Sequence, residues 1–397
     1  MSGIARRDDE ERQGARFAAR MAGAVAEVGA DAWGRLDTHG NPFVGYAFLS
    51  ALEDSGCCRA ETGWLPRHIV VEDEAGRVVG AMPAYLKSHS FGEYVFDHGW
   101  ADAFERAGGR YYPKLQASVP FTPVTGPRLL VARGADAGAV RGALISAAVQ
   151  LSARIGVSSL HVTFPTEAEW RRMGEAGMLL RTGEQFHWQN RGYRCFDDFL
   201  GTLNSRKRKM IRKERRRATE AGIAIRTLCG NDIEPRHWDA FYDFYMDTGS
   251  RKWGSPYLNR DFFALLGERL GERVALVMCE RDGRPIAGAL NLIGGDTLYG
   301  RNWGCMEHHD FLHFEACYYR AIDFAIERGL AWVEAGAQGP HKIQRGYLPK
   351  RTYSAHWIAD PAFRKAVEDY LRRERRQVEW EIEIVAREHT PYRRTAG

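Results

Sequence analysis

The order of apolar and polar positions repeats once along the chain. Around Gly80 the sequence has an apolar run, a polar turn with glycine and a second apolar run, and the same order recurs around Gly288. This order is typical of a β-hairpin. In each copy one apolar run belongs to the hairpin's first strand and an aromatic-rich run follows the hairpin. The runs predict strands at 68–72, 94–100, 274–279 and 297–303.

The repeat continues with a helix and a further strand. Residues 139–155 have helical periodicity and lead to a strand candidate at 159–164; residues 314–328 likewise lead to one at 331–335. The alternative is chance similarity between two common hairpins. Agreement of both order and spacing favours a duplicated α/β unit.

Four further segments complete the predicted organisation. A connector at 196–222 carries a short helix capped by Asp197 and Asp198, and a second helix capped by Asn204 or Ser205 that ends at Gly222. An aromatic helix is expected at 237–248 and a long charged helix at 360–389. The predicted division is an N-terminal segment with a first helix (1–40), a first domain (41–195), the connector (196–222), a second domain (223–358) and a C-terminal helix and tail (359–397).

Composition limits the class of protein. A chain of 397 residues exceeds the usual single-domain range. No apolar run approaches the roughly 18 residues that span a bilayer, and the charged N-terminus lacks the apolar core of a secretory signal. Seven cysteines, an odd number without a C-x-x-C spacing, predict buried thiols in a reducing compartment, hence a cytoplasmic protein. The spacing of His308, His309, Asp310 and His313 fits no zinc motif, so no metal site is expected.

Positive charge is concentrated in one segment. The formal net charge is +5, yet residues 205–217 alone hold nine Lys or Arg against one Glu. Only Met210, Ile211 and Ala218 offer apolar anchors there, so this helix is expected to gain little from packing. An anionic partner would relieve the repulsion between its cations.

Ten segments resemble the FemAB-like group of predicted N-acyltransferases, described under peptidoglycan biosynthesis or recognition. They are 41–53, 62–68, 94–100, 111–115, 120–126, 205–214, 249–254, 311–315, 334–342 and 345–349. The resemblance implies an α/β fold of two tandem GNAT-like domains and transfer of an acyl group to an amine. It implies no required cofactor, and a donor that is either aminoacyl-tRNA or acyl-CoA. Where the family motif often reads Gln-Gly-Glu-His-Lys, this chain has Pro340 in place of the Glu.

The loop after the predicted strand 331–335 is the main candidate for chemistry. Its glycines allow close backbone approach to a substrate, its histidine can donate or accept a proton, and its cations can pair with carboxylate or phosphate. The alternative is a surface turn with scattered polar residues; the family motif favours function. The predicted catalytic residues here are His341 and Lys342, and the predicted substrate contacts are Gln338, Arg345 and Tyr347.

Other polar residues are weaker candidates. Asp97 and His98, expected at a strand end, are predicted to line the site as catalytic residues. They can form an acid–base pair only if their side chains converge, and strand neighbours point to opposite faces, so a structural role is the alternative. His313 and Glu315 precede a helix, where a structural role for Glu315 at the helix terminus is the alternative. Arg251, Lys252 and Trp253 are predicted to hold an acidic substrate, with a loop cap over the core as the alternative.

The basic helix is the predicted contact for nucleic acid or phosphate, through Arg206, Lys207, Arg208, Lys209, Arg212 and Lys213. In Fem-like ligases the implied ligand is a tRNA acceptor stem. Neither half has the Arg/Gln-x-x-Gly-x-Gly/Ala pyrophosphate loop of acyl-CoA enzymes. Three functions therefore stay open: a Fem-like transferase, an acyl-CoA-dependent N-acetyltransferase, and an inert module that binds peptidoglycan precursor or nucleic acid. The acceptor is expected to be a small amine or peptidoglycan-precursor-like molecule, and the protein a monomer or homodimer.

Overall fold

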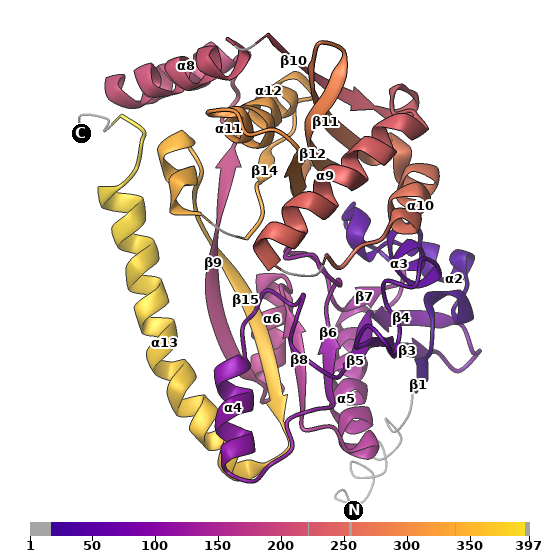
Figure 1. The fold of residues 1–397 in the computed structure, drawn as a ribbon. Coiled ribbons are helices and arrows are strands. Elements are labelled where there is room, and N and C mark those ends of the chain that lie inside the picture. The colour runs from indigo at the N-terminus through magenta and orange to yellow at the C-terminus, as the bar shows by residue number, and fades with distance from the viewer. Residues whose placement is uncertain (1–16, 221, 254–255, 338, 394–397) are drawn as a thin grey trace, which may run out of the picture.

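One long mixed sheet runs through the molecule (Figure 1). The computed structural model describes residues 17–220, 222–253, 256–337 and 339–393. The eleven strands of this sheet follow the order β10-β11-β12-β13-β14-β9-β15-β8-β6-β5-β2. Their bounds are β2 Trp64–Pro66, β5 Ala84–Lys87, β6 Lys114–Ala117, β8 Ser159–Thr163, β9 Leu179–Gln189, β10 Ile223–Cys229, β11 Val274–Arg281, β12 Arg284–Gly294, β13 Thr297–Cys305, β14 Trp332–Glu334 and β15 Leu348–Ile358.

A second, four-stranded sheet belongs to the first half of the chain. Its order is β1-β3-β4-β7, all antiparallel. The strands are β1 Ala18–Ala22, β3 His68–Glu72, β4 Val78–Met82 and β7 Leu130–Val131. The predicted hairpin around Gly80 is thus confirmed as β3 and β4.

The two halves of the chain exchange strands at the centre of the long sheet. β15, from late in the sequence, lies between β8 and β9, pairing Ala355 with Val162 on one side and Leu180 on the other. β9 then pairs at its far end with β14, where Trp188 faces Val333. Because each half completes the other's sheet, neither closes its hydrogen-bond ladder alone.

Two helices cover one face of the first half. α5 (Ala137–Ile155) and α6 (Glu167–Glu175) bury one face with β3, β6 and β8. Short elements η1 (Val25–Glu27), α2 (Ala30–Gly34) and η2 (Pro42–Val44) lead to α3 (Tyr46–Asp54).

The predicted strand at 94–100 is wrong. Tyr94 has φ +61°, a value that extended strands do not adopt, and Asp97 is the N-cap residue of helix α4 (His98–Arg106). The spacing of the aromatic residues in this segment matches that of a strand, but the backbone turns at Gly92 and Tyr94 before the helix begins.

Aromatic contacts join the two halves beside the long sheet. The predicted aromatic helix is α9 (Pro235–Trp253), which follows η3 (Gly230–Asp232) and precedes α10 (Arg260–Leu270) and η4 (Gly271–Arg273). Phe43 meets Tyr299 edge to face at 5.3 Å, and Phe48 meets Phe262 at 5.8 Å between ring centroids. A Cβ at Gly304 would collide with the backbone of Phe244, so glycine lets α9 lie directly on β13.

The remaining helices frame one end and one side of the molecule. The connector forms α7 (Phe196–Thr202) and the basic helix α8 (Ser205–Thr219), and of the two predicted caps of α8 the structure has Asn204. The predicted capping of α7 by Asp197 and Asp198 is wrong, because the N-cap residue is Cys195 and both aspartates lie in the first turn. The predicted helix 314–328 comprises α11 (Leu312–Phe314), the π-helical turn η5 (Glu315–Tyr319) and α12 (Arg320–Glu327). The predicted C-terminal helix is α13 (Pro361–Glu388), which packs along β9 and β15 (Figure 1).

The cysteines and the helix lengths bear on two further predictions from the sequence. No disulfide links the seven cysteines, but only Cys57, Cys58 and Cys279 are buried and Cys195 is exposed. Within the described residues, no helix has the length and apolar character needed to cross a membrane.

Candidate functional site

A gap opens in the long sheet where β13 and β14 part. The two strands pair in parallel only from Thr297 with Trp332 to Tyr299 with Glu334. β13 then continues along β12 to Cys305, whereas β14 ends at Glu334 and the chain turns at Gly336 with φ +77°. Glu334 is therefore the last residue of β14 that pairs with β13, and beyond it β13 has no strand partner on this side in the described part of the chain.

Glu334 is a carboxyl group held out of water with incomplete hydrogen bonding. Its side chain is 12% exposed, and Oε2 has no hydrogen-bond partner among the described residues. Burial raises the pKa of Glu334 to about 8, although Arg301, Lys350 and Arg128 act in the opposite direction. A carboxyl group that titrates near neutral pH is suited to proton transfer.

Lys342 lies under the loop that follows Glu334. Its ammonium donates a hydrogen bond of 2.8 Å to the carbonyl of Gly336, and the side chain is buried. Burial lowers the pKa of Lys342 to about 8, with a further lowering by the cation of Arg301. The loop thus places the ammonium of Lys342, which loses its proton more easily than an exposed lysine, against the backbone of Gly336, two residues after Glu334.

His187 and Arg301 complete the surroundings of Glu334. His187 Nδ1 lies 3.8 Å from Glu334 Oε1, and burial lowers the pKa of His187 to about 3, so its imidazole is neutral. Arg301, whose guanidinium donates to the carbonyl of Phe121 at 3.2 Å, also perturbs the pKa of Tyr94. The guanidinium of Arg301 and the neutral imidazole of His187 thus act on Glu334 directly, and the cation of Lys342 acts on His187.

The predicted loop residues gather around an aromatic cluster next to this gap. They lie in and after η6 (Pro340–Arg345). His341 is exposed and its Nε2 lies 2.9 Å from the hydroxyl of Tyr318. Partial burial of the imidazole is the main cause that lowers the pKa of His341, and the cations of Arg345 and Lys342 lower it further. Tyr347 is buried and donates to the carbonyl of Tyr318 at 3.2 Å. The predicted contact Gln338 lies outside the described residues.

Arg345 is a structural residue in this arrangement. Its guanidinium forms two hydrogen bonds with the buried carboxylate of Glu214 on α8, at 2.8 and 3.1 Å, and stacks on Phe314 at 3.5 Å. These contacts occupy the fork with which arginine would bind a substrate carboxylate.

The other second-half candidates have different surroundings. His313 packs edge to face on Trp303 and on Tyr318, each at 5.3 Å, beside the loop. Glu315 is buried and ion-paired with Arg215 at 2.9 Å, so its contacts connect helices. Arg251 is exposed on α9, paired with Asp247 and donating to the carbonyl of Cys305. The side chains of Lys252 and Trp253 lie outside the described residues.

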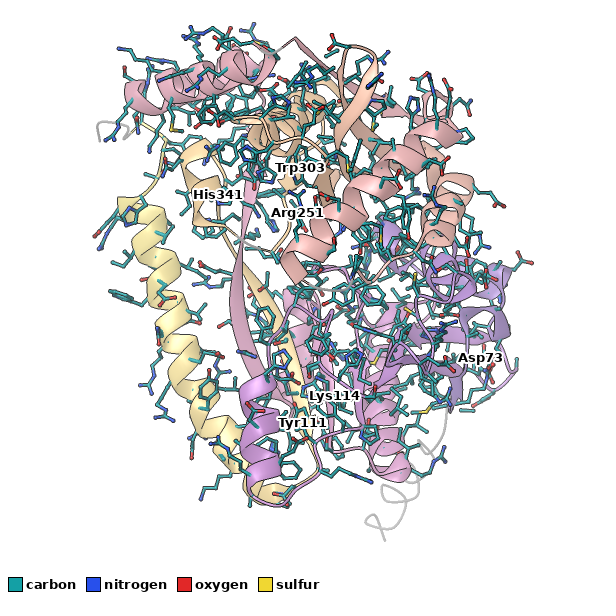
Figure 2. The ribbon with its side chains drawn as sticks, viewed as in Figure 1. Asp73, Tyr111, Lys114, Arg251, Trp303 and His341 are labelled. Carbon is teal, nitrogen blue, oxygen red and sulfur yellow. The ribbon has the colours of Figure 1, made fainter. Side chains whose placement is uncertain are left out.

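Asp97 and His98 do not join this cluster. Asp97 is buried against Lys114 and accepts a hydrogen bond of 2.7 Å from Tyr111, whereas His98 is exposed. Burial would raise the pKa of Asp97, but Lys114 outweighs it and holds that pKa below its ordinary value. Figure 2 shows Tyr111 and Lys114 together in the lower part of the molecule, well apart from His341 and Trp303 in the upper part. Asp97 and His98 therefore have different surroundings, one buried in a network with Lys114 and Tyr111 and the other exposed at the start of α4.

With this geometry established, comparison with known proteins gives the family. The profile of the FemAB-like family, described as peptidoglycan biosynthesis/recognition, matches residues 24–394. The chain belongs to the FemAB-like family. No curated protein sequence matches it.

Solved structures agree with this FemAB-like assignment at the level of the fold. FemX superimposes with a TM-score of 0.54 at 13% identity, over 85% of this chain and 97% of FemX. A conserved protein of unknown function from Bacteroides thetaiotaomicron gives 0.50 at 10%, over 86% and 99%. A tandem GNAT protein from the clavulanic acid biosynthesis pathway gives 0.42 at 15%, over 87% and 99%. The expected fold class is confirmed as α/β with a C-terminal helix, and the likeness to FemX extends over both halves of the chain.

Ion pairs fix the basic helix of this FemAB-like chain to η6, η5 and α12. Besides the Glu214–Arg345 pair, Arg215 bonds both Glu315 and Asp323. The expectation that α8 gains little from packing is therefore wrong, because its charged residues supply anchors that a count of apolar positions omits. Of the predicted phosphate contacts, Lys207 bonds Gln344 and Arg212 bonds Asp197. Arg206, Arg208, Lys209 and Lys213 have no ion pair with any described residue.

Sequence reasoning did not select Glu334, although it lies in a segment that carries the resemblance. One signal was available: a carboxylate at the end of the short apolar run 331–335. Burying a charged side chain in a strand costs free energy, so a carboxylate at such a position indicates a candidate functional residue. His187 and Arg301 gave no such signal, because their meeting depends on β9 lying beside β14.

Proposed function

We propose that this protein is an N-acyltransferase that moves an acyl or aminoacyl group onto an amine, with the reaction taking place in the gap beside Glu334. The observation that carries the proposal is the buried, incompletely hydrogen-bonded carboxyl of Glu334 at the point where β13 and β14 part. Membership of the FemAB-like family supports the transferase class.

The chemistry follows from what this carboxyl group can do. An amine attacks the carbonyl carbon of an activated ester or thioester; a C–N bond forms and the C–O or C–S bond breaks. The amine nitrogen loses a proton, which the ionised form of Glu334 accepts, and the leaving oxygen or sulfur takes up a proton. Because its pKa is about 8, Glu334 can both take and release a proton near neutral pH.

Neighbouring groups are placed to assist. In this proposal Lys342 and Arg301 supply the positive charge that stabilises the carbonyl oxygen when it becomes negative in the tetrahedral intermediate. His187 is neutral and can hold Glu334 in position without competing for its proton.

The donor is proposed from the basic helix. α8 is anchored to the site loop through Glu214 and Arg345, and its cations Arg206, Lys209 and Lys213 are exposed. A phosphate-bearing donor held on α8 would have its carrier close to η6. Aminoacyl-tRNA offers many phosphates and is the donor we favour; acyl-CoA, with fewer, is the second candidate.

Product analysis tests this proposal. The purified protein is incubated with a primary amine and either acetyl-CoA or charged tRNA, and the amide is detected by mass spectrometry. We expect amide from one of the two donors, reduced by a factor of about 100 or more in Glu334→Gln. Failure to form amide with both donors, over a panel of amines, would contradict the proposal.

A further inference from the structure

The register of the long sheet places Glu334 on the face that packs against Phe43. Glu334 pairs with Tyr299 on β13, and Tyr299 pairs with Leu292 on β12. Residues that pair on neighbouring strands point to the same face of a sheet. The ring of Tyr299 meets Phe43 edge to face at 5.3 Å. The carboxyl group of Glu334 therefore lies on this face, at the level where the pairing of β13 with β14 ends.

Arg301, two residues beyond Tyr299 on β13, projects to the same face. Its guanidinium carbon lies 5.7 Å from the ring centroid of Phe43, and Nη2 donates a hydrogen bond of 3.2 Å to the carbonyl of Phe121. The pairing of β13 with β14 has ended before Arg301 is reached. Among the charges that lower the pKa of Glu334, that of Arg301 has the largest effect. The guanidinium and the carboxyl group thus lie on one face beside the gap.

Arg301 differs from two other arginines of the site in having unused donors. Its Nε and Nη1 have no hydrogen bond to any described residue, and no described carboxylate forms an ion pair with it. Arg128, by contrast, donates from all three guanidinium nitrogens to backbone carbonyls, and Arg345 is held by Glu214. A partly buried guanidinium with unused donors is suited to bind an anionic group of a ligand.

Glu334 has the opposite deficit. Its Oε2 is shielded from water and accepts no hydrogen bond from any described residue. No ion pair joins Glu334 to Arg301, so the two groups do not satisfy each other. Leaving both unsatisfied is costly. An unused acceptor beside unused donors therefore indicates a ligand that carries a hydrogen-bond donor and an anionic acceptor together.

The charges around the gap favour a ligand with a negative group. The charged residues that act on the pKa of Glu334 are Arg301, Lys350 and Arg128, all of them cations. A simple amine would bring a further positive charge into these surroundings. An amine with a carboxylate next to it brings no net charge, and its two groups match Glu334 and Arg301.

We propose that the gap is the acceptor subsite and that it takes a free α-amino acid, with the carboxylate on Arg301 and the amino group on Glu334. This inference rests on the proposed transferase function and specifies its acceptor. It excludes the amino terminus of a peptide as acceptor, because the first residue of a peptide has no carboxylate beside its amine.

In the transfer step the carboxylate of the acceptor stays on Arg301. The bound ammonium first releases one proton to solvent. The neutral amine then attacks the carbonyl carbon of the donor, so that a C–N bond forms and the C–O or C–S bond breaks. The nitrogen gives a further proton to Glu334, and the leaving oxygen or sulfur takes up a proton. Because Arg301 holds the acceptor, stabilisation of the carbonyl oxygen falls mainly to Lys342.

Calorimetric titration tests this inference without any donor. The probes are the standard L-amino acids and, for each one that binds, its α-amide and its deaminated acid. We expect at least one amino acid to bind, and to bind at least about tenfold more tightly than either analogue. Absence of binding by every amino acid, or equal binding of an amino acid and its amide, would overturn the inference. Neither comparison needs a variant to fold.

Variants assign the two contacts. Arg301→Gln should weaken binding of the amino acid by about tenfold or more and remove its advantage over the amide. Glu334→Gln should instead reduce its advantage over the deaminated acid. Arg284→Gln, an exposed change of equal charge at the start of β12, should leave both comparisons unchanged. A folded Arg301→Gln protein that still prefers the amino acid to its amide would contradict the proposed carboxylate contact.

The outcomes separate this inference from the proposed function. Transfer that is as fast to an amine without a carboxylate as to the matching amino acid would overturn the inference and leave the transferase function intact. Selective amino-acid binding without transfer from either donor would contradict the transferase function and leave the amino-acid site standing.

Discussion

Ionising Glu334 in the native protein lowers the free energy of unfolding, a cost that a purely structural residue would avoid. Its pKa of about 8 lies above the ordinary glutamate value of 4.5, so the native protein retains a proton that the unfolded chain releases. The penalty for ionising it in the native state therefore grows as pH rises from about 4.5 to about 8 and is constant above that. Sites of function commonly keep such a penalty.

Replacing this residue should consequently stabilise the protein while removing activity. We expect Glu334→Gln to raise the free energy of unfolding by about 1–3 kcal/mol at pH 9, with a difference that shrinks toward pH 5. Urea unfolding at several pH values measures it. Glu214→Gln is the matched comparison: it breaks the buried pair with Arg345 and should cost about 2–4 kcal/mol. If both variants are destabilised alike, Glu334 is a structural residue.

At the scale of elements, some cations of α8 form ion pairs and others are exposed without one. Arg206, Lys209 and Lys213 recur at spacings of three and four, so they share one helix face, and none has an ion pair within the described part of the chain. Arg212, Arg216 and Arg217 are also exposed but pair with Asp197, Glu220 and Asp310. This contrast gives two triple variants of equal charge change.

Binding of an anionic carrier should depend on the first set. For uncharged tRNA, log affinity falls with log salt concentration. We expect Arg206→Gln/Lys209→Gln/Lys213→Gln to make this slope shallower by about 2–3. The paired set, Arg212→Gln/Arg216→Gln/Arg217→Gln, should change it by clearly less. Filter binding at four salt concentrations measures both. Equal slopes for the two triple variants and the wild type would rule out α8 as the carrier contact.

Secondary structure was largely predictable because it depends on local pattern. The hairpin pairs β3–β4 and β11–β12, the helices α5 and α9, and the Asn204 cap all follow from spacing and turn residues. The segment 94–100 failed because aromatic residues there line a loop, a role that periodicity does not distinguish from a strand. The convergence of His187, Arg301 and Glu334 was beyond prediction, since it follows from strand order and not from local sequence.

At the scale of the whole molecule, the exchanged strands bind the halves into one unit. β15 comes from the range predicted as the second domain, yet it lies between β8 and β9 of the range predicted as the first. The division of the sequence at 196–222 remains a prediction, but the hydrogen bonds of the sheet cross it. Removing β15 would leave both β8 and β9 with unpaired edges.

Unfolding should accordingly be cooperative. We expect urea unfolding followed by tryptophan fluorescence and by far-ultraviolet circular dichroism to give one coincident transition. A chain ending at residue 347, which lacks β15 and α13, should not reach the native state. Two separated transitions, or a stable folded truncated chain, would show that the halves fold independently.

The central claim, that Glu334 takes the proton of the attacking amine, is tested most directly by the pH dependence of kcat. With saturating donor and amine, the wild-type kcat should rise with an apparent pKa of about 8 and then level, because the ionised carboxylate is the active form. Lys342→Met should keep that limb, which excludes the other group titrating near 8. Glu334→Gln should lose the limb and retain about 1% of the activity or less. Persistence of the same limb in Glu334→Gln would contradict the account.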